Sequence, residues 1–464
     1  MLPFERGDRV AVLGLGASGV AAARLASALG ARVYASDASA ASGPREAASV
    51  LGAEGIDAEA GGHDLAKILD SRLVVTSPGI DPATEVRSAV TAAGIRTIAE
   101  VELAYRRLSS RVIAITGTNG KTTATALCGH VLEQAGVSAL TAGNIGRPLS
   151  EVALLERQPD WVVVELSSFQ LADLDQFASA IGVLLNLAPD HLDRYANLER
   201  YYADKARLFA NATDESLWVL NGDDAAVLDL AKGVPGRRHL TYAAAPRPGE
   251  DEGAVAGRAF VDAGGWLVCD LGGEVERWVR TNDLRLIGRH NWSNALLAGV
   301  AARLAGCSAA DVGRGLASFE GLPHRLRSVR EIDGVMWVND SKATNISATR
   351  VALEAFDRPL VVLLGGRHKG EPYTSLLPAV AGARAVVAYG ESAPIIVREL
   401  GPHVELEVAN GFEEAMRKAR GLARAGDVVL LSPACSSYDM FPSYAVRGDT
   451  FEEHVHAMRP EGAE

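Results

Sequence analysis

The sequence predicts an α/β protein of three domains whose sheets are mainly parallel. The chain has 464 residues, and at roughly 150 residues per domain this length corresponds to about three domains. Short apolar runs alternate with longer segments rich in alanine and leucine, which is the pattern of strands joined by crossover helices. In two places a glycine-rich turn joins an apolar run to a helical segment.

Nine short apolar runs are predicted to be strands. They are Val10–Leu13, Val33–Ala35, Leu73–Val75, Val112–Ile115, Trp161–Val164, Ile181–Leu185, Leu360–Leu364, Ala385–Tyr389 and Val428–Leu431. Polar or glycine-rich residues follow most of them. Open α/β sheets bind ligands just beyond the carboxyl ends of their strands, so these trailing residues are the first candidates for chemistry.

Two domain boundaries are expected. One lies near Ala99, ahead of the strand that begins at Arg111, and the other near Leu322, where glycine and proline interrupt a helical pattern. The resulting domains are residues 1–98, 99–321 and 322–464. Between Lys232 and Asp283 the sequence is rich in glycine and proline, which predicts an irregular β excursion without evident chemistry.

Charge and cysteine usage narrow the class of protein. Lys and Arg number 46 against 58 Asp and Glu, a formal net charge of −12 that repels nucleic acid and anionic membranes. The four cysteines lack metal-type spacing, which suits a reducing cytosol. No apolar stretch reaches the roughly 18 residues that span a bilayer. We therefore expect a cytoplasmic monomer without signal peptide, membrane anchor or nucleic-acid partner.

The first glycine-rich turn matches a nucleotide-binding pattern. Gly14-Leu15-Gly16-Ala17-Ser18-Gly19 follows a predicted strand and opens an alanine-rich helix, so a pyrophosphate can approach the helix N-terminus. Asp37 ends the next strand, where a ribose-binding acid is expected, and Ser77-Pro78-Gly79 is a candidate second wall. Taken alone, the pattern predicts a Rossmann-like domain with an NAD site. The alternative is a tight turn with close helix packing.

The second glycine-rich turn predicts a phosphate site. Thr116-Gly117-Thr118-Asn119-Gly120-Lys121-Thr122-Thr123 joins a strand to a helix. Backbone amides of such a loop cradle phosphates, the lysine neutralises their charge, and Thr122 is placed to contact magnesium. Ile115 stands where the strict Walker spacing has its first glycine. The loop is therefore a shortened relative of that motif, and a P-loop type of parallel-sheet ATPase domain is expected around it.

Two neighbouring strands supply candidate metal ligands. Glu165 ends one apolar run, and His191 follows another within Asn186-Leu187-Ala188-Pro189-Asp190-His191. A carboxylate and an imidazole at the rim of the sheet that carries the phosphate loop are typical of a magnesium site.

Taken together, these motifs resemble the Mur ligases over essentially the whole chain. The motifs of the first two thirds are Gly117-Thr118-Asn119-Gly120-Lys121-Thr122-Thr123, Gly143-Asn144-Ile145-Gly146, Glu165-Leu166-Ser167-Ser168-Phe169-Gln170, Asp190-His191-Leu192-Asp193 and Gly288-Arg289-His290-Asn291-Trp292-Ser293-Asn294. Those of the last third are Gly321-Leu322-Pro323-His324-Arg325, Asn339-Asp340-Ser341-Lys342-Ala343-Thr344-Asn345, Leu364-Gly365-Gly366 and Leu431-Ser432-Pro433-Ala434-Cys435-Ser436-Ser437. The last motif most resembles the D-glutamate-adding branch.

The resemblance implies an ATP-dependent ligase of peptidoglycan precursor synthesis that joins UDP-N-acetylmuramoyl-L-alanine to D-glutamate. It implies a C-terminal domain that is also Rossmann-like, and UDP rather than NAD at the first loop. The implied UDP-substrate contacts are Gly14, Ala17, Ser18, Asp37, Ser77, Pro78, Gly79 and Asn144. The implied ATP contacts are Gly117 to Thr123 (Gly117, Thr118, Asn119, Gly120, Lys121, Thr122, Thr123), Asn291, Asn294, Arg325 and Asp340. The implied D-glutamate contacts are Thr344, Lys369, Ser437 and Tyr444, the last replacing a frequent Phe.

The resemblance also implies the catalytic groups. Two magnesium ions are held by Thr122, Glu165, His191 and the carbamate of Lys205, and catalysis uses Lys121, Glu165, His191, Lys205 and Lys342. From the residues alone, Lys205 is a solvated helix lysine. A carboxylate and an amine do not condense unaided in water, so ATP must first convert the acid into an acyl phosphate. Each step gathers anions, which the lysines, His324 or Arg325, and the metal ions would stabilise.

Other functions stay open at this point. Sibling ligases add L-alanine, a diamino acid or a dipeptide, and a folylpolyglutamate synthase has the same nucleotide loop. A nicotinamide oxidoreductase built on the first loop and a regulatory ATPase belong to different classes. Amino-acid-dependent phosphate release separates these possibilities.

Overall fold

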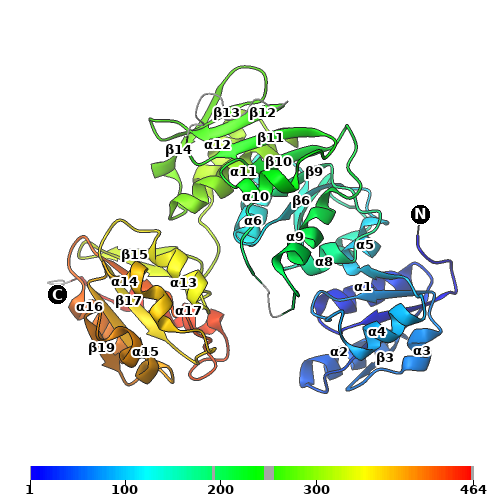
Figure 1. Cartoon of the computed structure of the whole chain (residues 1–464), viewed down its shortest axis with the longest axis horizontal. Coiled ribbons are helices and arrows are strands. Elements are labelled where there is room, and N and C mark those ends of the chain that lie inside the picture. Colours follow the sequence, from blue (N-terminus) through cyan, green and yellow to red (C-terminus); the bar gives the residue numbers. More distant parts are fainter. Residues whose placement is uncertain (1, 191–193, 245–254, 461–464) are drawn as a thin grey trace. The chain divides into compact units, whose positions relative to one another are not determined.

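A computed structural model of the chain describes residues 2–190, 194–244 and 255–460 (Figure 1). Three separate sheets carry the fold, and each of the nine predicted strand runs overlaps a strand. Residues Met1–Thr281 with Ser293–Ala317 form one compact unit that holds two of the sheets. Residues Asn282–Trp292 with Ser318–Glu464 form a second unit that holds the third. No helix in these described ranges is long and apolar enough to span a membrane.

The N-terminal sheet has five parallel strands in the order β3-β2-β1-β4-β5. Its elements are β1 Arg9–Leu13, α1 Ala17–Ala28, β2 Arg32–Asp37, α2 Ser42–Ala53, β3 Asp57–Ala60, α3 Leu65–Leu69, β4 Leu73–Thr76, α4 Glu85–Ala92 and β5 Thr97–Ala99. The central strands β1 and β4 are almost wholly buried because helices cover both faces of a parallel sheet. The strand order reverses between β1 and β4, and open α/β sheets bind ligands at such a position.

The central sheet has nine strands in the order β14-β13-β12-β11-β10-β9-β6-β8-β7. Its strands are β6 Arg111–Thr116, β7 Ala139–Gly143, β8 Trp161–Glu165, β9 Ile181–Leu184, β10 Leu217–Asn221, β11 Arg237–Tyr242, β12 Gly257–Val261, β13 Trp266–Asp270 and β14 Glu276–Arg280. Its helices are α5 Glu100–Tyr105, α6 Lys121–Gln134, α7 Leu149–Ala153, α8 Ser168–Ala172, α9 Leu198–Ala206, α10 Ala225–Leu230, α11 Arg289–Leu304 and α12 Ala309–Ser318, with 3-10 turns η1 Arg207–Phe209 and η2 Thr281–Asp283.

The glycine- and proline-rich stretch that ends at Asp283 extends this central sheet. The expectation of β structure there is confirmed, and the described strands join the main sheet with one register shift, between Trp266 and Val268. Strands β11 and β12 continue the parallel pairing and β13 and β14 pair antiparallel at the edge. In β12 alternate residues are buried, which is the pattern of a strand packed on one face and explains the short alternating pieces in the sequence.

The C-terminal sheet has six strands in the order β15-β16-β20-β17-β18-β19, all parallel except β15. Its elements are β15 Arg327–Ile332, β16 Val335–Asn339, α13 Ile346–Leu353, β17 Leu360–Gly365, η3 Tyr373–Leu376, α14 Leu377–Val380, β18 Ala385–Tyr389, α15 Ala393–Leu400, β19 Leu406–Ala409, α16 Phe412–Leu422, β20 Val428–Leu431 and α17 Tyr444–Ala457. Apolar clusters cover both faces of this sheet. The carboxyl ends of β16, β17 and β20 meet at one edge, because the three strands are parallel neighbours there.

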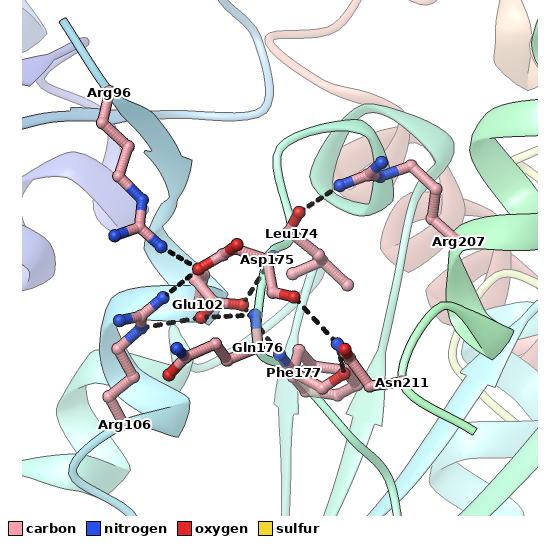
Figure 2. Close-up of polar contacts among 9 residues, drawn as sticks. All are labelled: Arg96, Glu102, Arg106, Leu174, Asp175, Gln176, Phe177, Arg207 and Asn211. Atoms are coloured by element: carbon pink, nitrogen blue, oxygen red, sulfur yellow. Dashed lines mark hydrogen bonds and ion pairs between the residues drawn. The ribbon is translucent and has the colours of Figure 1, made fainter. Parts of the chain in front are cut away.

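Helix α5 attaches the N-terminal sheet to the central sheet. The buried Glu102 carboxylate accepts the backbone N–H groups of residues 175–177 at 2.9 to 3.0 Å and pairs with Arg106 at 2.7 Å (Figure 2). Arg96, just before β5, and Arg106 both pair with Asp175. Burial of a carboxylate costs free energy unless hydrogen-bond donors and a cation compensate its charge, as they do for Glu102. The network therefore fixes the loop after α8 to both sheets of the first unit.

Candidate active site

Glycine shapes the loop between β6 and α6 for close contact. Gly117 has φ 156° and Gly120 has φ 80°, values that side chains disfavour. A Cβ on Gly117 would lie 2.9 Å from Leu185 Cβ, and one on Gly120 would lie 2.6 Å from Asn294 Oδ1. Helix α6 has no side-chain cap at Gly120 and no acid in its first turn. The positive end of the helix dipole therefore lies at the loop, as phosphate binding requires.

Side chains behind this loop hold its shape. Asn186 Oδ1 accepts the Asn119 N–H at 2.8 Å, and Asn186 Nδ2 donates to Asn119 O at 3.0 Å. The Thr118 hydroxyl donates to Ala188 O and hydrogen-bonds Tyr201 OH, each at 3.1 Å. Asn186 was not among the predicted site residues. Its place just beyond the carboxyl end of β9 is the signal in the sequence that could have identified it.

Two lysines converge on one carbonyl of the loop. Lys121 Nζ donates to Gly117 O at 3.0 Å and to Thr118 O at 2.7 Å, and Lys205 Nζ donates to Gly117 O at 2.8 Å. Lys205 is 1% exposed. Burial, followed by the nearby charge of Lys121, lowers the pKa of Lys205 to about 7.

The expectation of a solvated Lys205, drawn from the residues alone, is wrong. Helix α9 buries Tyr201 and Lys205, which are four residues apart and share one face of the helix. The ammonium group also lies 4.9 Å from the centroid of the Tyr201 ring. Lys205 therefore lies in the interior, where it contacts the loop between β6 and α6 through Gly117 O.

Glu165 lies buried at the carboxyl end of β8. It is 2% exposed, and its Oε1 accepts Asn144 Nδ2 at 3.1 Å. Gly143 has φ 115°, and a Cβ there would lie 2.2 Å from Glu165 O. Only glycine therefore allows the ends of β7 and β8 to approach this closely. Within the part of the chain that the structure describes, Glu165 makes no ion pair. A buried carboxylate held only by an amide is suited to receive a cation.

The predicted metal ligand His191 lies outside the described residues. Glu165 is the one described acid of the predicted ligand set. Among the residues that the structure describes, no three His, Cys, Asp or Glu side chains gather into a ready metal site. The four-ligand set predicted from the resemblance is therefore untested by this geometry.

The first glycine loop is tightly packed. Gly14 has φ 92°, and a Cβ on it would lie 2.9 Å from Ser77 Oγ. A Cβ on Gly19 would lie 1.8 Å from Gly14 O. Asp37 accepts the Leu15 N–H at 2.8 Å, so this acid supports the loop directly. These contacts bring Gly14, Asp37 and Ser77 together as predicted, and they also fit the alternative of a tight turn with close helix packing.

A small pocket that is partly open to solvent adjoins Ser77 and Pro78. The Phe169 and Tyr195 rings stack with centroids 5.7 Å apart, and the Arg194 guanidinium lies 4.1 Å from the Phe169 centroid. Arg194 Nη2 and Tyr195 OH are buried without a hydrogen-bond partner. The pocket thus offers aromatic faces together with polar donors.

The two asparagines predicted to contact ATP lie on helix α11 and are buried. Asn291 is 6% exposed and Asn294 is 5% exposed. Asn291 Nδ2 donates to Ile287 O at 2.7 Å, while Asn294 Oδ1 lies against Gly120 of the phosphate loop. Asn294 is therefore part of the surroundings of that loop. Both side chains therefore lie in the interior rather than on the surface.

In the second unit, a strained turn presents Arg325. Its neighbours His324 and Leu326 have φ 61° and 44°, in the left-handed region that costs on the order of 1 kcal/mol or more for such residues. Asp340 accepts the Leu326 N–H at 3.2 Å and the Ser432 hydroxyl at 2.8 Å. Burial raises the pKa of Asp340 to about 7. Strain and a perturbed acid coincide here, which is typical of functional sites.

Of the four residues predicted to hold the amino acid, Thr344 and Lys369 contact each other, and Tyr444 lies near the predicted catalytic Lys342. Lys369 Nζ donates to Thr344 Oγ1 at 3.2 Å. Lys342 Nζ lies 5.3 Å from the centroid of the Tyr444 ring. Ser437 is 2% exposed and follows Ala434, whose φ is 57°. These side chains all extend from strand ends or the start of α17 at the carboxyl edge of the C-terminal sheet.

Comparisons with known families match nearly the whole chain. The Mur ligase MurD-like N-terminal domain matches residues 8–99, the Mur ligase middle domain residues 115–302, and the Mur ligase glutamate ligase domain residues 324–435. The UDP-N-acetylmuramoylalanine–D-glutamate ligase of Salinibacter ruber is 42% identical over 467 positions, covering 99% of this chain and 100% of the relative. The enzyme of the same name from Anaeromyxobacter dehalogenans is 43% identical and covers 97% of each chain.

Solved structures share the architecture at low sequence identity. The pseudomurein peptide ligase type C of Methanothermus fervidus has a TM-score of 0.58 at 19% identity, and covers 97% of this chain and 100% of its own. The UDP-N-acetylmuramate-alanine ligase of Thermotoga maritima has a TM-score of 0.57 at 18% identity, with the same coverage. At this identity the two structures bear on the fold alone.

Proposed function

Because the chain belongs to the Mur ligase family, we propose that it joins D-glutamate to UDP-N-acetylmuramoyl-L-alanine with ATP. The observation that carries the proposal is the glycine-shaped loop at the start of α6, where Lys121 lies beside the buried Lys205. Relatives of this name align with the chain from end to end. The same comparisons support a cytoplasmic enzyme of peptidoglycan precursor synthesis. Its monomeric state stays a prediction that sedimentation would test.

The reaction makes an amide through an acyl phosphate. The L-alanyl carboxylate oxygen attacks the γ-phosphorus of ATP, and ADP leaves. The amine of D-glutamate then attacks the acyl carbon, and inorganic phosphate leaves as the tetrahedral intermediate collapses. Each step concentrates negative charge, so fixed cations and oriented dipoles should supply most of the rate enhancement.

The phosphate loop is proposed to hold the triphosphate of ATP. Its backbone and the N-terminus of α6 favour bound anions, and Lys121 would neutralise the charge that develops on the leaving ADP. Thr118 uses its hydroxyl inside the protein, so its contribution to ATP would come from its backbone. In the second unit, Arg325 and Asp340 are proposed as further ATP contacts.

Magnesium fits the chemistry of this locus. Glu165 is a buried carboxylate without a cationic partner among the described residues, and Thr122 stands in the first turn of α6. These oxygen donors suit the preference of Mg²⁺. His191 and a carbamate on Lys205 would complete the set for two ions. When bound, magnesium would neutralise phosphate oxygens and help to orient the triphosphate.

The environment of Lys205 supports its carbamylation. An amine must be neutral to attack CO₂, and a pKa of about 7 keeps a large neutral fraction at physiological pH. The amine nitrogen bonds to the carbon of CO₂ and loses one proton, which gives a carbamate anion. A buried anion would then stand beside the charge of Lys121 in place of a second buried cation. Carbamylation of Lys205 would thus replace the repulsion between two ammonium groups by an attraction between the carbamate and Lys121.

The remaining substrates are assigned to two other regions. The first glycine loop and Ser77 are proposed to hold the UDP diphosphate. The adjoining pocket, in which Arg194 Nη2 and Tyr195 OH lack a hydrogen-bond partner, is proposed to hold the sugar and its peptide substituent. The edge that carries Thr344 and Lys369 is proposed to hold D-glutamate.

Phosphate release tests the proposed function. The purified protein is supplied with ATP, magnesium and UDP-N-acetylmuramoyl-L-alanine, and with D-glutamate, L-glutamate, L-alanine or a diamino acid in turn. We expect release only with D-glutamate, together with an amide product detected by mass spectrometry. Release without any amino acid would indicate an ATPase, and release with another amino acid would indicate a sibling ligase.

A matched pair of lysine variants tests the phosphate loop. Lys121→Met should lower turnover on the order of 10²- to 10³-fold, as the loss of one charge-stabilising group typically does. Lys232→Met removes an exposed lysine of the same unit and should leave turnover unchanged. Equal activity of the two variants would contradict the assignment of Lys121.

A further inference from the structure

Arg447 is a buried cation without an anionic partner. It lies in the first turn of α17 and is 0% exposed, one of the largest fully buried side chains of the chain. Within the described ranges, no carboxylate forms an ion pair with it. Buried arginines are normally paired, because an isolated charge loses its hydration without compensation. Arg447 therefore needs an explanation beyond packing.

Its guanidinium joins three separate segments of the chain. Nε donates to Ser341 Oγ at 3.0 Å, and Nη2 donates to Ser341 O at 2.9 Å and to Cys435 O at 3.2 Å. Nη1 lies 3.4 Å from Gly365 O, which also accepts. Ser341 Oγ in turn donates to Tyr444 O at 2.7 Å. Carbonyl dipoles and one hydroxyl thus replace water around the charge but do not neutralise it.

These segments are the ones that carry the proposed amino-acid pocket. Each acceptor lies within four residues of a pocket side chain: Ser341 precedes Lys342 and Thr344, Gly365 precedes Lys369, and Cys435 precedes Ser437. Tyr444 lies on α17 itself, one turn before Arg447. A single guanidinium therefore holds all the strand ends from which the pocket is built.

The packing around Arg447 leaves little freedom. A Cβ on Gly366 would lie 3.2 Å from Arg447 Nη1 and 2.2 Å from Ser436 O. A Cβ on Gly448 would lie 2.1 Å from His324 Nδ1. Beside this cluster the fully buried Tyr389 hydroxyl has no hydrogen-bond partner. The edge of the sheet is thus close-packed around the guanidinium of Arg447.

We propose that Arg447 is a positioning residue of the amino-acid pocket. Its guanidinium holds the strand ends in place, and its uncompensated charge favours an incoming amino acid that carries an extra carboxylate. The inference rests on the proposed function, since it takes this edge as the site of the incoming amino acid. The carboxylates of a dicarboxylic amino acid would supply negative charge near Arg447, which forms no ion pair with a described carboxylate.

Variants of Arg447 test the proposal through Michaelis constants. Arg447→Gln keeps hydrogen-bonding groups and removes the charge. Arg447→Lys keeps the charge but loses the planar set of guanidinium N–H donors. We expect Arg447→Gln to raise KM for D-glutamate on the order of tenfold, which corresponds to about 1.4 kcal/mol of lost binding. KM for ATP should stay within about twofold. Arg447→Lys should recover part of the loss, and Arg398→Gln, an exposed change on α15, should have no effect.

Other outcomes would overturn the proposal. A KM for D-glutamate within about twofold of the wild-type value, an equal rise for all three substrates, or no recovery in Arg447→Lys would assign Arg447 a purely structural role. If Arg447→Gln does not fold, Ser341→Ala removes one partner of the guanidinium and should raise KM for D-glutamate alone. If the wild-type protein uses another amino acid, the proposed function fails, and the same comparison with that amino acid still decides the role of Arg447.

A structural readout needs no activity. In a crystal structure of Arg447→Gln without substrates, residues 341–344 and 435–437 should be displaced and the contact of Lys369 with Thr344 lost. In Arg398→Gln they should be unchanged. Superposition of these segments in Arg447→Gln and wild type would contradict the positioning role.

Discussion

Replacing Lys121 with methionine should raise the pKa of Lys205. Both Nζ atoms donate to Gly117 O, at 3.0 and 2.8 Å, so they lie no more than 5.8 Å apart. Two unit charges at that separation repel by about 0.7 kcal/mol in bulk water and about 3 kcal/mol at an effective dielectric constant of 20. One pKa unit corresponds to about 1.4 kcal/mol, so Lys121→Met should raise the pKa of Lys205 by about 0.5 to 2 units.

The shift should appear in the extent of carbamylation. Burial is the larger cause of the lowered pKa of Lys205. In Lys121→Met the pKa of Lys205 should therefore remain below the ordinary value of 10.5. With a pKa of about 7, about half of the Lys205 side chains are neutral near pH 7, against roughly one in three thousand for an ordinary lysine. Raising the pKa therefore lowers the fraction of amine that can bond to CO₂ at neutral pH.

Carbon-13 NMR in labelled bicarbonate measures this fraction. The carbamate signal is followed against pH in wild type and Lys121→Met, with Lys205→Met to identify the signal and Lys232→Met as the exposed control. We expect the midpoint of carbamate formation to move to higher pH in Lys121→Met and to stay in place in the control. A signal that persists in Lys205→Met, or equal midpoints in wild type and Lys121→Met, would refute the reasoning.

Four further predictions concern stability measured by urea unfolding. In CO₂-free buffer the free energy of unfolding should rise between about pH 7 and 10.5, because the unfolded chain holds the Lys205 proton longer, and Lys205→Met should lack this rise. Between about pH 3.8 and 7 it should fall because the folded state keeps the Asp340 proton, and Asp340→Asn should lack this fall. Glu102→Ala should cost about 3–5 kcal/mol, against about 0.5 kcal/mol or less for exposed Glu46→Ala. Gly143→Ala should cost at least about 1 kcal/mol, because its Cβ would lie 2.2 Å from a backbone oxygen. For Lys205 and Asp340, a variant with the same pH dependence as wild type would contradict the reason given. For Glu102→Ala and Gly143→Ala, an effect equal to that of Glu46→Ala would do so.

Local patterns were sufficient to predict most of the fold. The buried strands of parallel sheets are continuous apolar runs, and the turns after β1 and β6 need glycine for backbone reasons that act over a few residues. Short edge strands such as Asp57–Ala60 lack that signal and were missed. The stretch between Lys232 and Asp283 was expected to be irregular because it is rich in glycine and proline, which hides the short strands within it.

Sequence patterns could not predict contacts between residues that lie far apart in the sequence. Lys205 meets Gly117 across 88 positions, and Arg447 meets Ser341 across 106. Neither the burial of a helix lysine nor the isolation of an arginine can be derived from its neighbours in the sequence. Glu102 is similar, since the three amides that it accepts lie more than 70 positions away.

The buried charges of this chain fall into two physical kinds. Glu102 has three amide donors and an arginine, so its charge is fully compensated and its removal should mainly cost stability. Glu165, Lys205 and Arg447 are as deeply buried, but among the described residues none of them forms an ion pair with a group of opposite charge. A charge left uncompensated by its own protein destabilises the fold until a ligand of opposite sign arrives. We therefore propose that these three charges lie where substrates, metal ions or CO₂ bind, because binding would offset the cost of burying them.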